Sequence, residues 1–277
     1  MAKAKKATPK QTYSMGWMPD LPDARDFMYA PPLMVMQSLP VKMDLRSKCP
    51  AVYNQGGLGS CTANALGAAF QVGQKIQGKT TWIPSRLFLY YNERVYIHME
   101  AVDSGAYLRD GIKSLAKTGV CKESEWTYDD RRTPGSKFSI KPPATCYTHA
   151  LQNKIISYQR LSNNLGILKG CLAEGYPFVF GFTVYESFMT TRVRTTGIMP
   201  MPNLTTEKVV GGHAVMAVGF DDSKQAILVR NSWGSSWGIG GYFWMPYAYI
   251  SNSNYADDFW TIRSLKAQAL ARKAKRK

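Results

Sequence analysis

The chain has 277 residues, 45% of them hydrophobic and 12% aromatic, so it can bury one large core or two smaller ones and is not an unfolded or fibrous protein. No stretch approaches the roughly 20 consecutive apolar residues that span a bilayer, and no apolar segment follows the basic residues 1–10. These features argue against a membrane protein and against secretion. We expect the protein inside the cell, in the cytosol, the nucleus or an intracellular particle.

The net charge is +16, and ten of the positive charges lie at the two ends of the chain. Neither end contains an acidic residue, and the basic residues are Lys3, Lys5, Lys6, Lys10, Lys266, Arg272, Lys273, Lys275, Arg276 and Lys277. Such runs attract nucleic acid or other polyanions, but they also occur as solubilising ends that bind nothing. We predict a disordered basic tail over 1–12 and a basic C-terminal tail over 266–277, and both are candidate polyanion contacts.

The five cysteines are odd in number and irregularly spaced, without a C-x-x-C pair that would indicate zinc or a redox motif. A reducing compartment keeps thiols unpaired. We therefore expect mostly free thiols, and neither a metal nor a cofactor.

The segment 13–39 precedes the main domain, which we place at 40–265. It contains the text GWMPDLPDARDFMYAPP from Gly16 to Pro32. Because prolines favour extended backbone over helix, we predict an extended arm pinned to the domain surface. The run from Leu39 to Tyr53 also contains prolines and predicts a short extended entry into the core.

Helix-forming residues dominate the first half of the domain. The sequence SCTANALGAAFQVGQKIQ, which begins at Ser60, has apolar residues spaced for one buried face, with Ser60 or Gly59 as the cap. Further helices are expected at Ser85–Ile97 and Leu108–Thr118, the second one ended by Gly119.

Short runs rich in β-branched and aromatic residues follow, separated by glycine and aspartate: YPFVFGFTVY, GGHAVMAVGFDD, AILVRNSW and GGYFWMPYA. They predict an antiparallel sheet. A helical lobe over about 55–150 and a β-rich lobe over about 151–262 together predict an α+β fold, with a cleft between the lobes.

One cysteine lies in a position that favours a reactive thiolate. Cys61 begins the first predicted helix, directly after the loop Gln55-Gly-Gly-Leu-Gly-Ser60. Unpaired backbone N–H groups and the helix dipole at that end stabilise a thiolate, the reactive form of cysteine. On position alone, a buried cysteine that only packs is the commoner case.

Two later residues complete a pattern for nucleophilic catalysis. His213 opens the strand HAVMAVGF after a glycine pair, where its ring can exchange a proton with the sulfur. Asn231 ends the strand AILVRN, and its side-chain oxygen can accept from the second imidazole nitrogen and fix the tautomer. Taken separately, a core histidine and an asparagine turn are ordinary structural features. His98 and His149 have no partner motif, so we assign them no role.

Gln55 precedes Cys61 by six residues, with glycines between them. Its side-chain amide can fold back and, with the Cys61 backbone N–H, bind a developing oxyanion. The alternative is a solvated loop glutamine. The candidate catalytic residues are therefore Cys61, His213, Asn231 and Gln55.

These stretches resemble the papain family of cysteine peptidases. Val52-Tyr-Asn-Gln55-Gly-Gly-Leu-Gly-Ser-Cys61 is similar to its oxyanion and nucleophile loop, Gly212-His213-Ala214-Val215 to its histidine strand, and Asn231-Ser-Trp-Gly234 to its asparagine loop. His213 and Asn231 follow Cys61 by 152 and 170 residues, in the family's order. The resemblance covers about residues 40–262.

The resemblance implies a two-lobe fold, helical on the left and an antiparallel β-barrel-like sheet on the right, with the active site in the cleft. It implies hydrolysis of peptide bonds in protein or peptide substrates. It also implies that Asp103-Ser-Gly105-Ala106-Tyr107 borders the substrate cleft. We expect Gly105 and Ala106, with Gly212 and Trp233, to bind the substrate.

Three departures from the family pattern bear on this expectation. Leu58 stands where many members have a cysteine, so the disulfide of secreted relatives is not expected. Thr62 replaces the usual aromatic residue after the nucleophile, which alters the packing behind the helix. Only about 40 residues precede the domain, fewer than the long helical inhibitory prosegment of many relatives, so two alternatives are open: the arm from Gly16 to Pro32 stays attached, with or without blocking the cleft, or it is removed.

Two other functions remain open at this stage. A papain-like scaffold could have a structural or polyanion-binding role in a particle or nucleoprotein assembly, with the basic tails making the contacts. An acyl-enzyme could also be intercepted by an amine, which would be transpeptidation.

Overall fold

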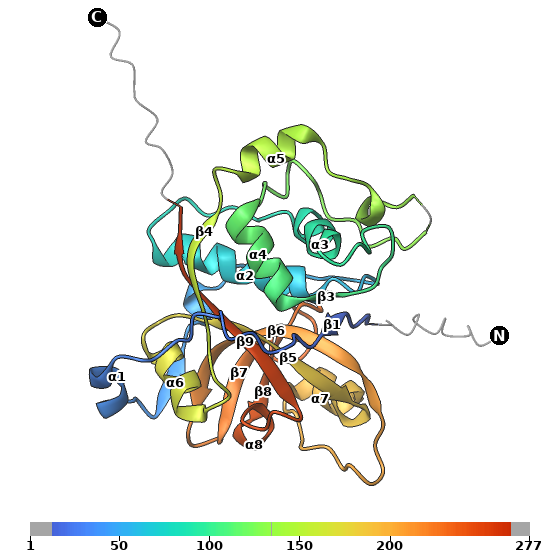
Figure 1. The fold of residues 1–277 in the computed structure, drawn as a ribbon. Coiled ribbons are helices and arrows are strands. Elements are labelled where there is room, and N and C mark those ends of the chain that lie inside the picture. Colours follow the sequence, from blue (N-terminus) through green and yellow to red (C-terminus); the bar gives the residue numbers. More distant parts are fainter. Residues whose placement is uncertain (1–12, 134, 267–277) are drawn as a thin grey trace, which may run out of the picture.

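Helices form the upper layer and strands most of the lower layer of the molecule in Figure 1. This computed structural model describes residues 13–133 and 135–266, so the predicted tail 1–12 and all but the first residue of the tail 266–277 lie outside the described residues. Within the two described ranges, none of the helices has both the length and the apolar character of a membrane span.

The upper layer contains the three helices expected from the sequence and one more: α2 (Cys61–Ile76), α3 (Arg86–Val95), α4 (Leu108–Lys117) and α5 (Ala144–Ala150). Helix α2 is buried from Cys61 to Gln74, because α3 and α4 pack on it from the helical side and strands of the lower layer from the other. This burial on all sides explains its many small residues. Gly119 ends α4 as predicted, with a φ of 81° that favours glycine.

Ser60 is the cap residue of α2, as predicted, but its side chain does not do the capping. Ser60 precedes the helix, but its hydroxyl makes no capping bond. It pairs instead with the Tyr128 hydroxyl at 2.6 Å, and the Asn64 amide donates to the Ser60 carbonyl oxygen at 2.9 Å. The start of α2 is thus held by side chains of the helical layer.

The lower layer is a seven-stranded antiparallel sheet with the order β4-β9-β5-β6-β7-β8, and β2 pairs with β6 outside this path. Its strands are β2 (Lys42–Asp44), β4 (Ile155–Arg160), β5 (Phe178–Tyr185), β6 (Val209–Asp221), β7 (Ala226–Arg230), β8 (Tyr242–Pro246) and β9 (Ala256–Leu265). The helices α6 (Leu165–Ala173), α7 (Thr191–Thr196) and α8 (Tyr247–Ile250) lie in the connections. The α+β two-lobe fold is confirmed, although β2 adds a strand from well before residue 151.

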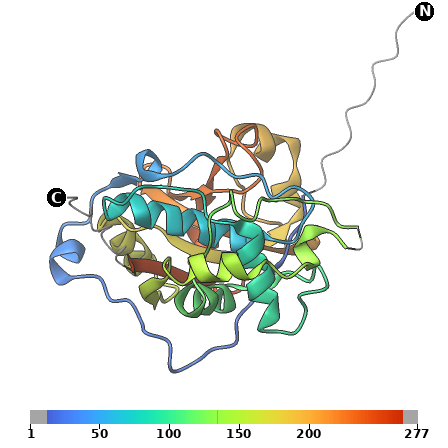
Figure 2. The same cartoon turned by 90° about the horizontal axis from the view of Figure 1, so that it is seen from above.

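The N-terminal arm lies between the two layers. Its strand β1 (Trp17–Met18) pairs in parallel with β3 (Ala106–Tyr107), and Figure 1 shows this blue segment crossing the middle of the molecule. The arm is not extended throughout, because Leu33–Gln37 form the short helix α1 after Pro32. Met36 of α1 packs against Gly170 of α6. Seen from above, the segment between β1 and α1 runs along one edge of the molecule (Figure 2).

Candidate active site

Cys61 is the first residue of α2, and its side chain is completely buried. The backbone N–H groups of Ala214, Gly16 and Thr62 donate toward its sulfur. Burial nevertheless raises the pKa of the Cys61 thiol to about 11, which outweighs these donors. The sequence predicted a thiolate at this helix start, but burial keeps this thiol neutral, and Gly16 of the arm is among the residues that lie against it.

His213 and Asn231 lie together in the sheet. Strands β6 and β7 pair with Met216 opposite Arg230, so the two residues at this end meet. The Asn231 Oδ1 is 2.8 Å from His213 Nε2 and also accepts from the Ser232 backbone N–H at 2.8 Å. An atom that accepts from a backbone amide is the carbonyl oxygen, so His213 Nε2 carries the hydrogen.

The other ring nitrogen of His213, Nδ1, is buried and has no hydrogen-bond partner among the residues that the structure describes. Burial lowers the pKa of His213 to about 4, although the bond to Asn231 opposes this change. At neutral pH the imidazole is therefore uncharged, and Nδ1 keeps a free lone pair. One of the backbone N–H groups that donate to the Cys61 sulfur belongs to Ala214, the next residue along β6.

Trp233 covers the imidazole. Its ring stacks on His213 with centroids 4.7 Å apart, and Tyr13 of the arm stacks on Trp233 at 4.2 Å. Trp233 is 1% exposed, and the His213–Asn231 bond is buried beside it. This arrangement shields the His213–Asn231 bond from water.

Gln55 is also completely buried, and its amide is held at both ends. Its Oε1 accepts from the Ser232 hydroxyl at 2.6 Å, which fixes Nε2 as the donor. The Nε2 group donates to the carbonyl oxygens of Ser14, at 3.0 Å, and Leu58, at 2.9 Å. The donor predicted to bind an oxyanion is thus bound to a peptide carbonyl of the arm.

The arm fills the groove between the two layers over residues 13–18. Beside the contacts of Tyr13 and Ser14, the Gly16 carbonyl oxygen accepts from the Ala106 N–H at 2.7 Å. A methyl group on Gly16 would overlap the backbone carbonyl of Gly59, so only glycine fits this position. Gly59 is itself held through its N–H by the carboxylate of Asp103, at 3.0 and 3.3 Å.

All four residues expected to bind substrate contact the arm instead. Gly105 has a φ of 78°, and a side chain there would overlap Gly16. Gly212 lies against Trp17 in the same way. Together with Ala106 and Trp233, these residues form the walls against which one extended stretch of polypeptide lies.

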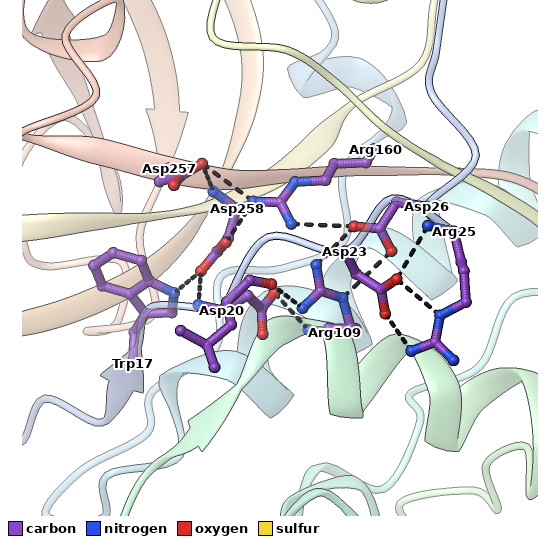
Figure 3. Close-up of polar contacts among 10 residues, drawn as sticks. Trp17, Asp20, Asp23, Arg25, Asp26, Arg109, Arg160, Asp257 and Asp258 are labelled. Carbon is purple, nitrogen blue, oxygen red and sulfur yellow. Dashed lines mark hydrogen bonds and ion pairs between the residues drawn. The ribbon is translucent and has the colours of Figure 1, made fainter.

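Behind Trp17, an ion-pair cluster fastens the arm to α4, β4 and β9 (Figure 3). Arg109 and Arg160 reach Asp26 of the arm at 2.6 and 3.2 Å. Asp20 accepts from the Arg109 backbone N–H at 3.1 Å and donates its own N–H to Asp258 at 2.7 Å. Burial raises the pKa of both Asp20 and Asp258, and each lies close to the other's carboxyl.

Thr62, the residue that departs from the family pattern, has a buried partner. Its hydroxyl donates to Glu93 Oε2 at 2.6 Å, while Glu93 Oε1 has no partner within the described part of the chain. Burial raises the pKa of Glu93 to about 8. A hydroxyl and a neutral carboxyl thus pair behind the nucleophile, at the position where the family pattern has an aromatic residue.

Four residues of this region had not been singled out from the sequence: Ser232, Glu93, Trp17 and Asp258. Ser232 lies inside the asparagine motif, so the sequence contained a signal from which its place beside Gln55 could have been found. Trp17 belonged to the predicted arm, but no local pattern indicates where an arm docks. All five cysteines are unpaired thiols, and residues 13–133 and 135–266 contain no group of three His, Cys, Asp or Glu side chains that could hold a metal ion.

Comparisons with known proteins place the chain in a family. The family model described as papain family cysteine protease matches residues 39–259. The "uncharacterized peptidase C1-like protein L477" of Acanthamoeba polyphaga mimivirus is 45% identical over 221 residues, 76% of this chain and 69% of that protein. The "cathepsin B-like CP2" of Giardia intestinalis is 27% identical over 87% of this chain and 74% of its own length.

Among solved structures, xylellain, a cysteine protease from Xylella fastidiosa, is 46% identical and superposes with a TM-score of 0.87. The alignment covers 93% of this chain and 99% of xylellain. Because it covers 93% of a 277-residue chain, the likeness extends beyond residues 39–259 into other parts of the sequence.

Proposed function

Since this chain belongs to the papain family of cysteine proteases, we propose that it hydrolyses peptide bonds with Cys61 as the nucleophile and His213 as the proton carrier. The observation that carries the proposal is the arm itself. A peptide carbonyl of this chain, that of Ser14, already lies on the Gln55 amide, and the next-but-one residue donates its N–H to the Cys61 sulfur. A substrate peptide bond in the same groove would meet the same groups.

The free lone pair of His213 Nδ1 supports the first step. The thiol proton moves to Nδ1, and the sulfur attacks the substrate carbonyl carbon. The carbonyl oxygen takes up negative charge, which the Gln55 Nε2–H and the Cys61 backbone N–H stabilise. The C–N bond then breaks, and the amine leaves with the proton that His213 had accepted.

Asn231 and Trp233 support the second half of the cycle. A water molecule gives a proton to His213 Nδ1 and attacks the thioester, which releases the acid and restores the thiol. Throughout, Asn231 Oδ1 accepts from Nε2–H and holds the ring in one tautomer. Trp233 keeps water away from that bond.

The same geometry means that substrate and arm exclude each other. The arm uses the Gln55 donor, the Ala106 N–H and the face of Trp233. Substrate therefore enters only when residues 13–18 leave the groove.

The test uses the chain with Gly16→Ala, which cannot seat its arm, and a peptidyl electrophile whose adducts are located by mass spectrometry. We expect one adduct, on Cys61, and no peptide turnover by the additional variant Cys61→Ala. A matched control is Cys49→Ala, which removes a partly exposed thiol and should leave labelling and turnover unchanged. Equal labelling yield or retained turnover in Cys61→Ala would reject the proposal.

A further inference from the structure

A buried carboxyl lies behind the nucleophile, and no step of the proposed mechanism uses it. Glu93 of α3 and Thr62 of α2 are both completely buried. The Thr62 hydroxyl donates to Glu93 Oε2 at 2.6 Å. The backbone N–H of the same threonine donates to the Cys61 sulfur. One residue therefore contacts both the reacting sulfur and the carboxyl of Glu93.

The surroundings of Glu93 favour its protonated form. Its Oε1 has no hydrogen-bond partner among the residues that the structure describes. The guanidinium of Arg94, the next residue, donates to the backbone carbonyl oxygens of Tyr90 and Glu100 instead of to this carboxyl. An ionised carboxylate would thus have one buried oxygen without a donor, which costs much more than burying the neutral acid.

Gly111 of α4 makes room for the carboxyl. A methyl group on Gly111 would overlap the Leu66 side chain of α2 and would lie only 2.6 Å from Glu93 Oε1. The helices α2, α3 and α4 therefore meet at this point with a carboxyl between them. The space is built for Glu93, because a larger residue on α4 would displace it.

One ionisable group from each of these three helices acts on Glu93 or responds to it. Arg94 of α3 favours the ionised carboxyl and Asp110 of α4 the neutral one, but burial outweighs both and raises the pKa of Glu93 to about 8. A negative charge on Glu93 in turn raises the pKa of the Cys61 thiol. Lys137, in the turn that also packs on α3, bonds elsewhere.

The charge of Glu93 matters because the reaction places negative charge at the start of α2. A thiolate forms at Cys61, and the oxyanion then forms beside the Cys61 backbone N–H. While Glu93 is neutral, the N–H groups and the dipole at this helix start stabilise that charge unopposed. A second negative charge behind the helix start would repel it.

We propose that Glu93 is a positioning residue that works only in its protonated form: it fixes Thr62 beside the sulfur, and once it has lost its proton to solvent its charge opposes the Cys61 thiolate. This inference rests on the proposed peptidase function. It predicts that activity falls in weakly alkaline solution because a carboxyl ionises.

Infrared spectroscopy tests the coupling without depending on turnover. The carbonyl stretch of a protonated carboxyl disappears on ionisation, and Glu93→Gln identifies the band that belongs to Glu93. In the Gly16→Ala chain the band should disappear above about pH 8, because the Cys61 thiolate opposes the ionisation. Adding Cys61→Ser removes that charge and should move the midpoint down by roughly half a pH unit or more, since the coupling is reciprocal. An unmoved midpoint would overturn the proposal.

Kinetics tests the effect on the reaction. Values of kcat/KM for peptide hydrolysis are measured from about pH 6 to pH 9 in the Gly16→Ala chain, with and without Glu93→Gln, and their ratio is taken so that other titrating groups cancel. The ratio should be constant up to about pH 7 and then rise about threefold to tenfold in favour of Glu93→Gln. A constant ratio over the whole range would overturn the proposal, because a merely structural role gives that result. The exposed Glu186→Gln is the matched control and should give a constant ratio.

Two variants of Thr62 locate the effect. Thr62→Val keeps the shape and removes the hydroxyl, which favours the ionised form of Glu93, so the fall in activity should move to higher pH. Thr62→Ser keeps the hydroxyl and should keep the pH profile of the Gly16→Ala chain. Equal pH profiles for the two variants would overturn the role of the Thr62–Glu93 bond.

The two readouts separate this inference from the peptidase function. Peptide turnover with a constant kcat/KM ratio would overturn the role of Glu93 and leave the peptidase function intact. No turnover in any variant, with a Glu93 titration that responds to Cys61→Ser, would overturn the peptidase function and leave the coupling between Glu93 and the sulfur intact.

Discussion

The two sides of the groove differ in where their polar groups find partners. On the sheet side, Asn231 Oδ1 accepts from His213 Nε2–H and from the Ser232 backbone N–H, all within β6 and the loop after β7. On the helix side, Gln55 and Cys61 bond to atoms of the arm, namely the Ser14 carbonyl and the Gly16 amide. The His213–Asn231 bond therefore needs no atom of the arm, whereas Gln55 Nε2 and the Cys61 sulfur both bond to the arm in this structure.

When the arm closes the groove, it therefore acts mainly on the Cys61 sulfur and on the Gln55 side-chain amide, the oxyanion donor. Displacing the arm frees Gln55 Nε2 and exposes the Cys61 thiol, while the His213–Asn231 bond keeps both its atoms. A sheet-side variant whose effect on activity depends on the arm would contradict this comparison. Helix-side groups whose reactivity is the same with and without the arm would also contradict it.

The largest of the following effects is expected from Asn231→Ala, made in the chain that also carries Gly16→Ala. Without Asn231 Oδ1, nothing fixes the His213 tautomer, and kcat for peptide hydrolysis should fall on the order of 10²-fold or more. Steady-state kinetics measures it. Asn254→Ala, in the exposed turn before β9, is the matched control and should keep full activity. An unchanged kcat in Asn231→Ala would mean that the sheet side does not position the imidazole.

A smaller effect is expected from Tyr13→Ala in the otherwise unaltered chain. Its ring stacks on Trp233 at 4.2 Å, and aromatic pairs of this kind contribute enough to shift an equilibrium about 2- to 10-fold. Losing the stack should open the groove more often and raise peptide turnover by that factor. Phe27→Ala removes an arm aromatic that is 74% exposed, and its turnover should match the unaltered chain. Equal rates for both variants would show that Tyr13 does not help to close the groove.

The third effect concerns stability instead of activity, and it is a pH dependence that comes from Glu93. Its pKa is raised from an ordinary value of about 4.3 to about 8 by burial. Its contribution is fully present below the ordinary value and is lost as the pH rises through about 8, because only the unfolded state ionises readily in between. The free energy of unfolding should therefore decrease from pH 5 to pH 8 relative to Glu93→Gln, which stays neutral.

Urea unfolding at several pH values measures this difference, with the exposed Glu186→Gln as control. The control should follow the unaltered chain across the range. Parallel curves for the unaltered chain and Glu93→Gln would contradict a neutral buried carboxyl at this position.

The fold could be predicted from local patterns because each element carries its own signal. Apolar spacing indicated α2, α3 and α4, and β-branched runs indicated the strands from β5 to β8. Helix α1 was missed because the proline-rich text around it favours extended backbone and its five residues are too few for a periodic pattern. Strand β2 was missed because only three residues pair.

The candidate site was likewise predictable only in part. The motifs around Gln55, Cys61, His213 and Asn231 name the residues, and the structure brings His213 to Asn231 and Gln55 to Ser232. The protonation state could not be predicted, because it depends on burial under an arm whose docking place is a long-range property. Asp258 had no signal either, since its bond to the Asp20 N–H depends on where the arm docks.

The central claim is that the arm covers a reactive thiol, that of Cys61, on the helix side of the groove. The rate at which iodoacetamide alkylates Cys61 at neutral pH tests this claim most directly. Removing the cover should bring the pKa of the thiol down from about 11 toward or below that of an ordinary cysteine. The account predicts that Gly16→Ala speeds alkylation of Cys61 on the order of 10²-fold or more, while Cys49 in the same chain reacts at an unchanged rate. Equal rates at Cys61 with and without the Gly16 substitution would contradict it.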